Sequence, residues 1–453
     1  MFTILFLLLA VYMVWFLVAK SDSVINSSYN KRQELYAKNV IRGDILSADG
    51  KVLATSDDDG DSDTREYPYD DLYAHAVGFT TNGKAGVESQ YNFYLLRSHA
   101  FVLKRIYHNL AGEKDQGDSV VTTLDSNLQE TAYDALGGDD GAVIAIEPDT
   151  GKILAMVSKP DFDPNTVAYD WDDIVNDEDS SVLLNRATQG LYPPGSTFKI
   201  ITALEYMREN SNYNSFSYDC EGEVTRDDYT IHCYKGAVHG EEDLEESFAH
   251  SCNTAFSTIG LSLNIGKLNS FCNSMLFNQA LPTGLKTAKS QFALSDSEGE
   301  GKIMTTSIGQ GDTLVSPIHM AMIASAICND GVLCKPYIAD HIENEAGTVV
   351  RRFDKQEYGK LLSKEDTQRI RSLMEAVTDY GTGSALSGRG YDVAGKTGSA
   401  EYNEDKDSHG WFVGYAQDGE KEIAIAVIVE DGGSGSSSAV PVAGEVFDAY
   451  FDE

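Results

Sequence analysis

The sharpest local signal in the chain is the run Tyr192-Pro193-Pro194-Gly195-Ser196-Thr197-Phe198-Lys199. Two prolines and a glycine end one element there, and a helix is expected to begin near Ser196. Residues at helical spacing would form its apolar face: Phe198, Ile201, Leu204 and Met207. Ser196 and Lys199 are three residues apart, so their side chains share one face of that helix.

The pair of Ser196 and Lys199 suits nucleophilic catalysis. A serine hydroxyl is a poor nucleophile unless a base removes its proton, and a lysine can be that base when burial or a second cation lowers its pKa. The helix N-terminus also favours negative charge that develops beside Ser196. S-x-x-K alone is very common, however, and taken alone the motif is better explained as a capping serine followed by an exposed lysine.

Two later motifs favour the catalytic interpretation. Ser251-Cys252-Asn253 offers a hydroxyl that can shuttle a proton and an amide that can hold a peptide carbonyl or a lysine. In the run 394–400, Ala-Gly-Lys-Thr-Gly-Ser-Ala, the glycines suit a strand edge that a ligand approaches closely. Lys396 supplies a cation for a carboxylate, and Thr397 supplies a hydroxyl. Gly395-Lys396-Thr397 also resembles the end of a phosphate-binding loop, but we do not predict such a loop here.

Composition narrows the class of protein. The 453 residues are 42% hydrophobic and 23% charged, which is typical of a globular chain of about two or three domains. Seventy-one acidic against 35 basic residues give a formal net charge of −36. Such a surface repels phosphate backbones and anionic headgroups, so we expect no nucleic-acid partner, and membrane attachment needs a dedicated segment.

The segment Met1–Ala19 contains no charged residue and is followed by Lys20. As a helix it would span roughly 28 Å, close to the thickness of a bilayer core. It lacks the basic n-region and the cleavage site of a secretory signal, and its apolar run is too long for one. We therefore predict an uncleaved single-pass anchor with the rest of the chain on one side of the membrane. The flanking charges do not determine which side.

The remaining pattern predicts a mixed α/β layer fold, with one sheet in the larger domain. A hairpin with an Asp-Gly turn is expected over 42–54, and the acidic run 57–63 is expected to be a solvated loop because it fails the calcium-loop formula. A polar link at 112–117 marks a domain boundary. Beyond it we expect strands at 119–124, 141–146, 153–158, 411–415 and 423–429, a helix with a serine cap at 126–136, and helical stretches within 196–280 and 363–380.

Six cysteines occur, at positions 220, 233, 252, 272, 328 and 334. They form no C-x-x-C, and no Cys/His group has zinc-like spacing, so no metal site is predicted. The pairs Cys220–Cys233 and Cys328–Cys334 are close enough in sequence to form disulfides in an oxidising compartment. Buried free thiols are the other interpretation, and the sequence leaves both open.

S-x-x-K, S-x-N and K-T-G in this order are the motif set of the penicillin-recognising enzymes. With them the chain resembles a class B penicillin-binding protein, a monofunctional peptidoglycan D,D-transpeptidase. The resemblance covers nearly the whole chain. It extends to further runs that are similar to the family's: Asn30-x-Arg32, Arg42-Gly43-Asp44-Ile45, Gly86-Val87-Glu88, 157–165, 185–187, Ile308-Gly309-Gln310-Gly311 and Ser316-Pro317.

The resemblance implies a mixed α+β architecture in three parts. These are a transmembrane anchor (1–20), a small β-rich extracytoplasmic pedestal or dimerisation-like module (21–117), and a transpeptidase domain (118–453) with a central antiparallel sheet flanked by helices. Residues 21–117 are too few for a glycosyltransferase. Glycan strands would therefore come from a partner, a membrane-embedded polymerase of the shape, elongation, division and sporulation group. The enzyme would lie in the cell membrane with its catalytic domain outside the cytoplasm.

The resemblance also implies a role for each motif residue. Ser196 would be acylated by the penultimate D-alanine of a stem peptide and then resolved by an amine of a neighbouring stem, with Lys199 as base. Ser251 and Lys396 would pass a proton to the leaving amine, and Asn253 would hold the acyl-side amide. Lys396 and Thr397 would bind the substrate carboxylate, beside Gly398. The backbone N–H groups of Ser196 and Ser399 would form the oxyanion hole.

Neither a cofactor nor a metal is implied, and β-lactams would be covalent inhibitors. Three alternatives stay open at this point. A D,D-carboxypeptidase differs only in using water to resolve the acyl-enzyme, and a serine β-lactamase carries similar motifs. A sensor or scaffold would be acylated without cross-linking anything.

Overall fold

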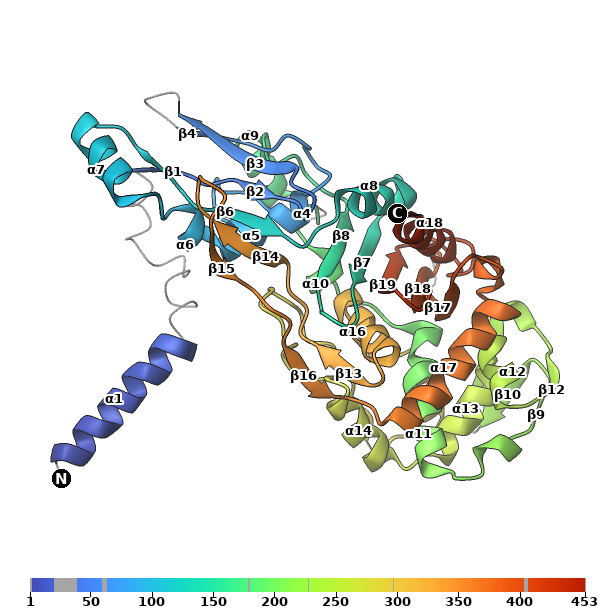
Figure 1. Cartoon of the computed structure of the whole chain (residues 1–453). Coiled ribbons are helices and arrows are strands. Elements are labelled where there is room, and N and C mark those ends of the chain that lie inside the picture. The colour runs from blue at the N-terminus through green and yellow to red at the C-terminus, as the bar shows by residue number, and fades with distance from the viewer. Residues whose placement is uncertain are drawn as a thin grey trace. The chain divides into compact units, whose positions relative to one another are not determined.

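The computed structural model describes residues 2–19, 39–58, 63–177, 180–226, 228–295, 297–402 and 406–452 (Figure 1). The chain divides into two compact units. Unit 1 comprises residues 1–122, 163–176 and 339–353, and unit 2 comprises 123–162, 177–338 and 354–453. Both units are therefore assembled from several separate segments of sequence.

Unit 1 is built on a six-stranded sheet in the order β15-β14-β6-β2-β3-β4. Its strands are β2 (Ile45–Leu46), β3 (Val52–Asp58), β4 (Asp63–Glu66), β6 (Ser119–Thr122), β14 (Ala339–Glu343) and β15 (Val349–Arg352). A separate parallel pair joins β1 (Val40–Ile41) to β5 (Asp115–Gln116). The helices are α1 (Phe2–Ala19), α4 (Ala74–Val77), α5 (Gly86–Gln90), α6 (Asn92–Leu95), α7 (Val102–Ala111) and α9 (Val167–Asn176).

The hairpin predicted over 42–54 is confirmed, because β2 pairs antiparallel with β3 and Ile45 lies opposite Ala54. The solvated loop predicted over 57–63 is only partly right. Asp58 still belongs to β3 and lies opposite Asp63 of β4. The remaining positions of that loop, 59–62, are outside the described residues.

The N-terminal helix α1 carries the predicted anchor sequence. Within the described part of the chain, no helix meets both the length and the apolarity that crossing a membrane requires. The transmembrane anchor stays a prediction.

A buried ion cluster holds the first segments of unit 1 together. The Glu88 carboxylate of α5 is fully buried and accepts hydrogen bonds from Arg42 Nε at 2.6 Å and from Arg65 Nε at 2.7 Å. Arg42 also donates to Asn92 Oδ1 at 2.6 Å, and Arg65 donates to the Gly43 carbonyl at 2.9 Å. The two sequence runs 42–45 and 86–88, which are distant in sequence, therefore meet through charge.

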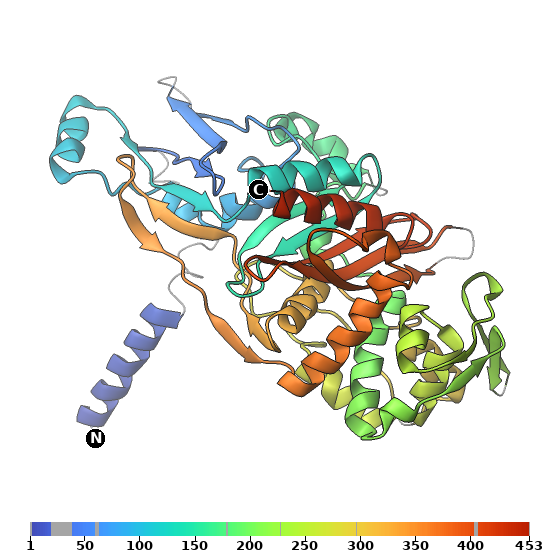
Figure 2. The same ribbon diagram turned by 45° about the vertical axis from the view of Figure 1, so that its right-hand side comes forward.

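Unit 2 contains a five-stranded, wholly antiparallel sheet in the order β17-β18-β19-β7-β8. The strands are β7 (Gly141–Ile146), β8 (Ile153–Lys159), β17 (Asp392–Ala400), β18 (His409–Gln417) and β19 (Glu422–Val429). Helices α8 (Ser126–Leu136) and α18 (Ala439–Phe451) pack together on this sheet and bury a hydrophobic core with it (Figures 1 and 2). Helix α16 (Pro317–Cys328) is buried and packs against β7, β18 and β19. The predicted mixed α+β fold is confirmed.

One prediction about a helix cap is wrong. Helix α8 begins at Ser126 as expected, but its cap is Asp125, whose carboxylate accepts a hydrogen bond from the Leu128 N–H at 2.9 Å. Aspartate and serine cap helices about equally well, and here the residue one position earlier has the extended backbone that a cap requires.

The rest of unit 2 is mostly helical. Its helices are α10 (Arg186–Gln189), η1 (Gly195–Phe198), α11 (Lys199–Glu209), η2 (Tyr213–Ser215), η3 (Tyr234–Gly236), α12 (Leu244–Ala249), α13 (Asn253–Ser262), α14 (Ile265–Ser274), α15 (Glu300–Ser307), α17 (Lys364–Asp379) and η4 (Ser384–Leu386). Three two-stranded sheets complete it: β9 (Tyr218–Cys220) with β12 (Gly240–Glu242), β10 (Glu223–Arg226) with β11 (Tyr229–His232), and β13 (Val332–Cys334) with β16 (Glu357–Lys360).

Candidate active site

Ser196 lies in the short 3-10 helix η1, and α11 continues directly from it at Lys199. The predicted helix therefore exists, but its first turn is tighter than an α-helix. Because side chains at i and i+3 of a 3-10 helix are eclipsed, this turn still places Ser196 and Lys199 on one side. Among the described residues the Ser196 hydroxyl makes no hydrogen bond, and the side chain is half-buried at the wall of a groove.

The turn before Ser196 depends on a glycine. Gly195 has a φ of 51°, and its N–H donates to the Gly309 carbonyl at 2.9 Å. A Cβ atom at Gly195 would lie 2.6 Å from the Ser399 carbonyl oxygen, and one at Gly309 would lie 2.0 Å from the Gly195 carbonyl oxygen. Two backbone segments that are distant in sequence thus fix the position of the nucleophile.

Lys199 is fully buried, with its Nζ directed at three oxygen atoms. It lies 2.7 Å from the Ser251 carbonyl oxygen, 2.7 Å from Asn253 Oδ1 and 3.2 Å from Ser251 Oγ. A neutral amine satisfies this set by donating to the two carbonyl-type oxygens and accepting from the hydroxyl. Burial lowers the pKa of Lys199 to about 8, so roughly one-tenth of the amine is neutral at pH 7, far more than for an exposed lysine.

The Ser251-Cys252-Asn253 turn joins α12 to α13. Ser251 adopts a left-handed backbone with a φ of 58°, and Cys252 caps α13 by accepting from the Ala255 N–H. Asn253 Nδ2 donates to the His232 carbonyl at 3.0 Å, while its Oδ1 accepts from Lys199. Asn253 therefore links Lys199 to the strand β11.

Lys396 lies on β17 and is also fully buried. Its Nζ donates to the Thr397 carbonyl at 3.1 Å, and burial, followed by the charge of Lys199, holds the pKa of Lys396 well below its usual range. Lys396 does not line the groove, whereas Thr397 does, with its Oγ1 2.6 Å from Thr382 Oγ1. The structure thus places the Lys396 charge behind Thr397 rather than on the groove wall.

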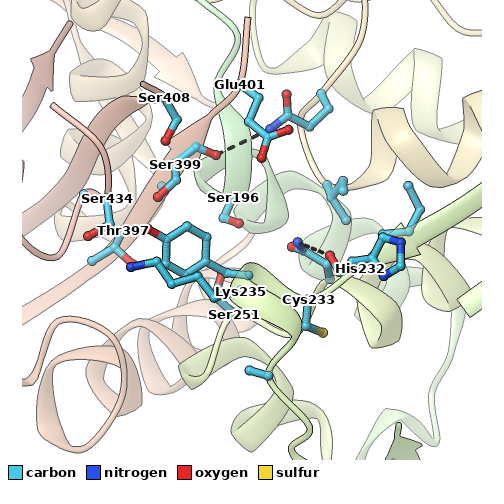
Figure 3. Close-up of a pocket in the computed structure, with 18 of the residues that line it drawn as sticks. Ser196, His232, Cys233, Lys235, Ser251, Thr397, Ser399, Glu401, Ser408 and Ser434 are labelled. Carbon is cyan, nitrogen blue, oxygen red and sulfur yellow. Dashed lines mark hydrogen bonds between the residues drawn. The ribbon is translucent and has the colours of Figure 1, made fainter. Parts of the chain in front are cut away.

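The groove has a volume of 1440 Å³ and brings together six of the eight predicted site residues. These are Ser196, Ser251, Asn253, Thr397, Gly398 and Ser399, and the two buried lysines, Lys199 and Lys396, do not line it. Figure 3 shows Thr397, Ser399 and Ser434 on one side of Ser196 and His232 and Cys233 on the other.

Sequence reasoning missed several residues of this groove. Thr382 supports Thr397, and Gln310 Nε2 donates to the Ser399 carbonyl at 3.4 Å. Gln310 belongs to the run 308–311 that was noted without a role, whereas Thr382 had no signal at all. The segment 229–239 forms a further wall and was also not predicted to lie there.

A second group of side chains lies next to this site. Cys220, Cys233, His239 and Cys252 present ligand atoms that are all within 4.8 Å of one another, although their spacing in sequence did not predict a metal site. All six cysteines are buried free thiols here, including both pairs for which a disulfide was one interpretation.

Comparison with known proteins agrees with this geometry. Residues 141–448 match the penicillin binding protein transpeptidase domain, and residues 42–120 match the penicillin binding protein A dimerisation domain. The chain therefore belongs to the penicillin-binding protein transpeptidase family, as its three motifs predicted.

Named relatives and solved structures are similar along nearly the whole chain. The peptidoglycan D,D-transpeptidase PbpA of Mycolicibacterium smegmatis is 31% identical over 94% of this chain and 92% of its own. The D,D-transpeptidase domain of a peptidoglycan glycosyltransferase from Eggerthella lenta is 30% identical, with a TM-score of 0.82, over 91% of this chain and 99% of its own. Penicillin-binding protein A from M. tuberculosis was solved as an imipenem acyl-enzyme complex. It is 27% identical, with a TM-score of 0.83, over 92% of this chain and 100% of its own.

Proposed function

We propose that this chain is a serine-type peptidoglycan D,D-transpeptidase that β-lactams acylate. The observation that carries the proposal is the meeting of three motifs around one half-buried serine. Ser196 is at the groove wall, Lys199 contacts Ser251 and Asn253, and Lys396 lies behind Thr397. The names of the relatives and the acyl-enzyme complexes of the structural neighbours support the same reaction class.

Acylation begins when the Ser196 hydroxyl attacks the carbonyl carbon of the penultimate D-alanine. Neutral Lys199 takes the hydroxyl proton, and the new C–O bond forms as the tetrahedral oxygen becomes negative. The backbone N–H groups of Ser196 and Ser399 stabilise that oxygen, an effect typically worth about 3–4 kcal/mol for one donor. The C–N bond to the terminal D-alanine then breaks as the Ser251 hydroxyl gives its proton to the leaving amine and takes the proton held by Lys199, whose Nζ lies 3.2 Å away.

An amine of a second stem peptide then attacks the acyl-enzyme. The same groups act in reverse, so that Lys199 accepts the amine proton and Ser196 leaves as the alcohol. Asn253 orients the acyl-side amide and Lys199 together. Products are the cross-linked peptide and the restored serine, and the reaction needs neither a metal nor an organic cofactor.

The substrate carboxylate is bound by hydroxyl groups that line the groove. Thr397 and its neighbour Thr382 offer two hydroxyls there. Lys396, fully buried, donates to the Thr397 carbonyl and acts on Thr397 electrostatically, and the charges of Lys199 and Lys396 disfavour each other.

The acylation rate is expected to rise with pH. Lys199 acts as a base only when neutral, so below its pKa of about 8 the rate should increase about tenfold for each pH unit and level off above it. The measurement is the rate of labelling by a fluorescent penicillin between about pH 6 and pH 9. A profile that is flat across this range would contradict the role of Lys199 as the base.

The function is tested with the full chain in detergent, glycan strands whose stems end in D-Ala-D-Ala, and an amine acceptor. We expect cross-linked stem dimers by mass spectrometry, with one D-alanine released for each link. Release of D-alanine without dimers would indicate a carboxypeptidase, and sustained nitrocefin turnover would indicate a β-lactamase. Penicillin labelling without any product would indicate a sensor or scaffold.

We also propose that the segment 1–20 anchors the enzyme in the cell membrane and that the catalytic domain acts outside the cytoplasm. The uncharged sequence of α1 and a substrate that lies outside the membrane support this arrangement. We divide the rest into the pedestal module 21–117, which the dimerisation-domain match partly covers, and the transpeptidase domain 118–453. Recovery of the full chain in the soluble fraction of cells, without detergent, would refute the anchor.

The anchor and the pedestal module would also keep the transpeptidase domain close to a glycan polymerase in the same membrane. Cross-linking consumes newly made strands, and an anchor with a pedestal raises the effective concentration of the two active sites. The proposed partner is a membrane-embedded glycan polymerase of the shape, elongation, division and sporulation group. Failure of the two proteins to co-purify from membranes after cross-linking would contradict this pairing.

A further inference from the structure

Three thiols and one imidazole converge beside the active site. Cys220 Sγ lies 3.7 Å from Cys233 Sγ and 3.3 Å from His239 Nδ1, and Cys233 Sγ lies 3.8 Å from Cys252 Sγ. In a tetrahedral site with Zn–S bonds of about 2.3 Å and a Zn–N bond of about 2.0 Å, two sulfurs are about 3.8 Å apart and a sulfur and a nitrogen about 3.5 Å. These three separations therefore match edges of a zinc tetrahedron, and all four ligand atoms lie within 4.8 Å of one another.

The surroundings of the four groups suit a structural ion. Cys220, Cys233 and Cys252 are buried, with exposed fractions of 0%, 2% and 0%. Donors point at the sulfurs: Thr254 Oγ1 donates to Cys220 Sγ at 3.2 Å, and the Ala255 N–H donates to Cys252 Sγ at 3.4 Å. Donors of this kind stabilise thiolates, as does the N-terminus of α13 next to Cys252.

We propose that Cys220, Cys233, His239 and Cys252 bind one Zn²⁺ ion. Three cysteines and a histidine form a closed four-ligand set, which is typical of structural zinc and leaves no position for substrate. A disulfide is the competing use of these sulfurs. It would join only two of the three and leave the third thiol and His239 without a role, whereas an ion engages all four.

The ligands are adjacent to the groups that hold Lys199. Cys252 is the central residue of the turn whose neighbours, Ser251 and Asn253, both contact Lys199 Nζ. Cys233 follows His232, whose carbonyl accepts the hydrogen bond from Asn253. The ion would thus tie the 229–239 wall of the groove to the Ser251–Asn253 turn, and its ligands are positioning residues rather than catalytic ones.

This consequence for catalysis rests on the proposed function, but the binding of the ion does not. The first measurement is therefore metal content. The full chain, purified in detergent with a phosphine reductant and Zn²⁺ and then freed of unbound metal, is expected to hold one zinc per chain by mass spectrometry. Replacement by Co²⁺ should give the thiolate-to-cobalt charge-transfer absorption of a tetrahedral site.

Matched variants identify the ligands. Cys220→Ser and His239→Ala should lose the bound zinc and the cobalt absorption, while Cys272→Ala, at a buried thiol of α14 outside the cluster, should keep both. Should a ligand variant not fold, chelation of the unmodified chain provides the second test. The chelated chain should then unfold at a lower temperature and regain its stability when Zn²⁺ is returned.

Chelation is also expected to slow penicillin acylation by about 10- to 100-fold, because small displacements of catalytic groups have effects of this size. An intact mass lower by two hydrogens, together with no bound zinc, would show a disulfide and overturn the proposal. So would zinc that stays bound in both ligand variants. Loss of cross-linking with intact zinc binding would instead count against the proposed function alone.

Discussion

Ser196→Ala is expected to abolish covalent labelling by penicillin completely. Among the described residues that line the groove, Ser196 is the motif serine that shares a turn with a buried lysine. Labelling is measured by intact-mass spectrometry, where the unmodified chain should gain one adduct.

Lys199→Ala keeps the nucleophile but removes the base, and its acylation rate should fall by about 10²- to 10⁴-fold.

The matched control is Ser408→Ala. Ser408 also lines the groove, but its hydroxyl donates to the Gly433 carbonyl at 2.8 Å and lies outside all three motifs. This variant should be labelled at close to the normal rate. An adduct that persists after Ser196→Ala would assign the nucleophile to another residue and remove the basis of the mechanism.

Glu88→Gln is expected to destabilise unit 1 by about 3–5 kcal/mol, the usual cost of breaking a buried ion pair from one side. The amide would leave Arg42 and Arg65, both in contact with the buried carboxylate, without a compensating charge. The measurement is hydrogen exchange of strands β2 and β3 as a function of urea. Glu66→Gln, at an exposed carboxylate of the same sheet, should change stability by less than about 0.5 kcal/mol.

The same cluster gives unit 1 a dependence on acid. Burial alone would raise the pKa of Glu88, but the charges of Arg42 and Arg65 outweigh it and hold that pKa below its ordinary value. A carboxyl with a depressed folded-state pKa stabilises the fold above its unfolded-state pKa and loses that contribution as the pH falls through the folded value. Exchange in β2 that stays equally slow in Glu88→Gln and in the unmodified chain would contradict both statements.

The sequence predicts local structure well where one short-range signal determines it. The strands β7, β8, β18 and β19 occur within a few residues of their predicted positions, because each is a long apolar run bounded by turns or polar residues. The helix start at Ser196 is right to within one turn. Its 3-10 geometry was not predicted, and neither was the close approach of Gly195 to Gly309 and Ser399, which lie far away in sequence.

The motif residues could be identified because their residue types and their spacing are typical of the family. Their positions relative to the groove could not be predicted in the same way. Lys396 was expected to bind the substrate carboxylate with Thr397, and this role stays a prediction; its burial behind Thr397 is what the sequence did not indicate. The cysteine and histidine cluster was dismissed because its members are spread over 220–252. Their approach depends on how β9, β11 and α13 pack, which no spacing rule contains.

The glycine contacts around Ser196 also determine when the enzyme can first react. Gly195 is supported by Gly309 and by the Ser399 backbone of β17, so the nucleophile is held by segments separated by more than a hundred positions of chain. Such distant contacts form late, because the intervening chain must first be ordered. A chain whose synthesis has not yet reached β17 therefore carries its serine but not the support of that strand. Reactivity towards wall precursors, and towards penicillin, arrives only when synthesis and folding of the catalytic unit are nearly complete.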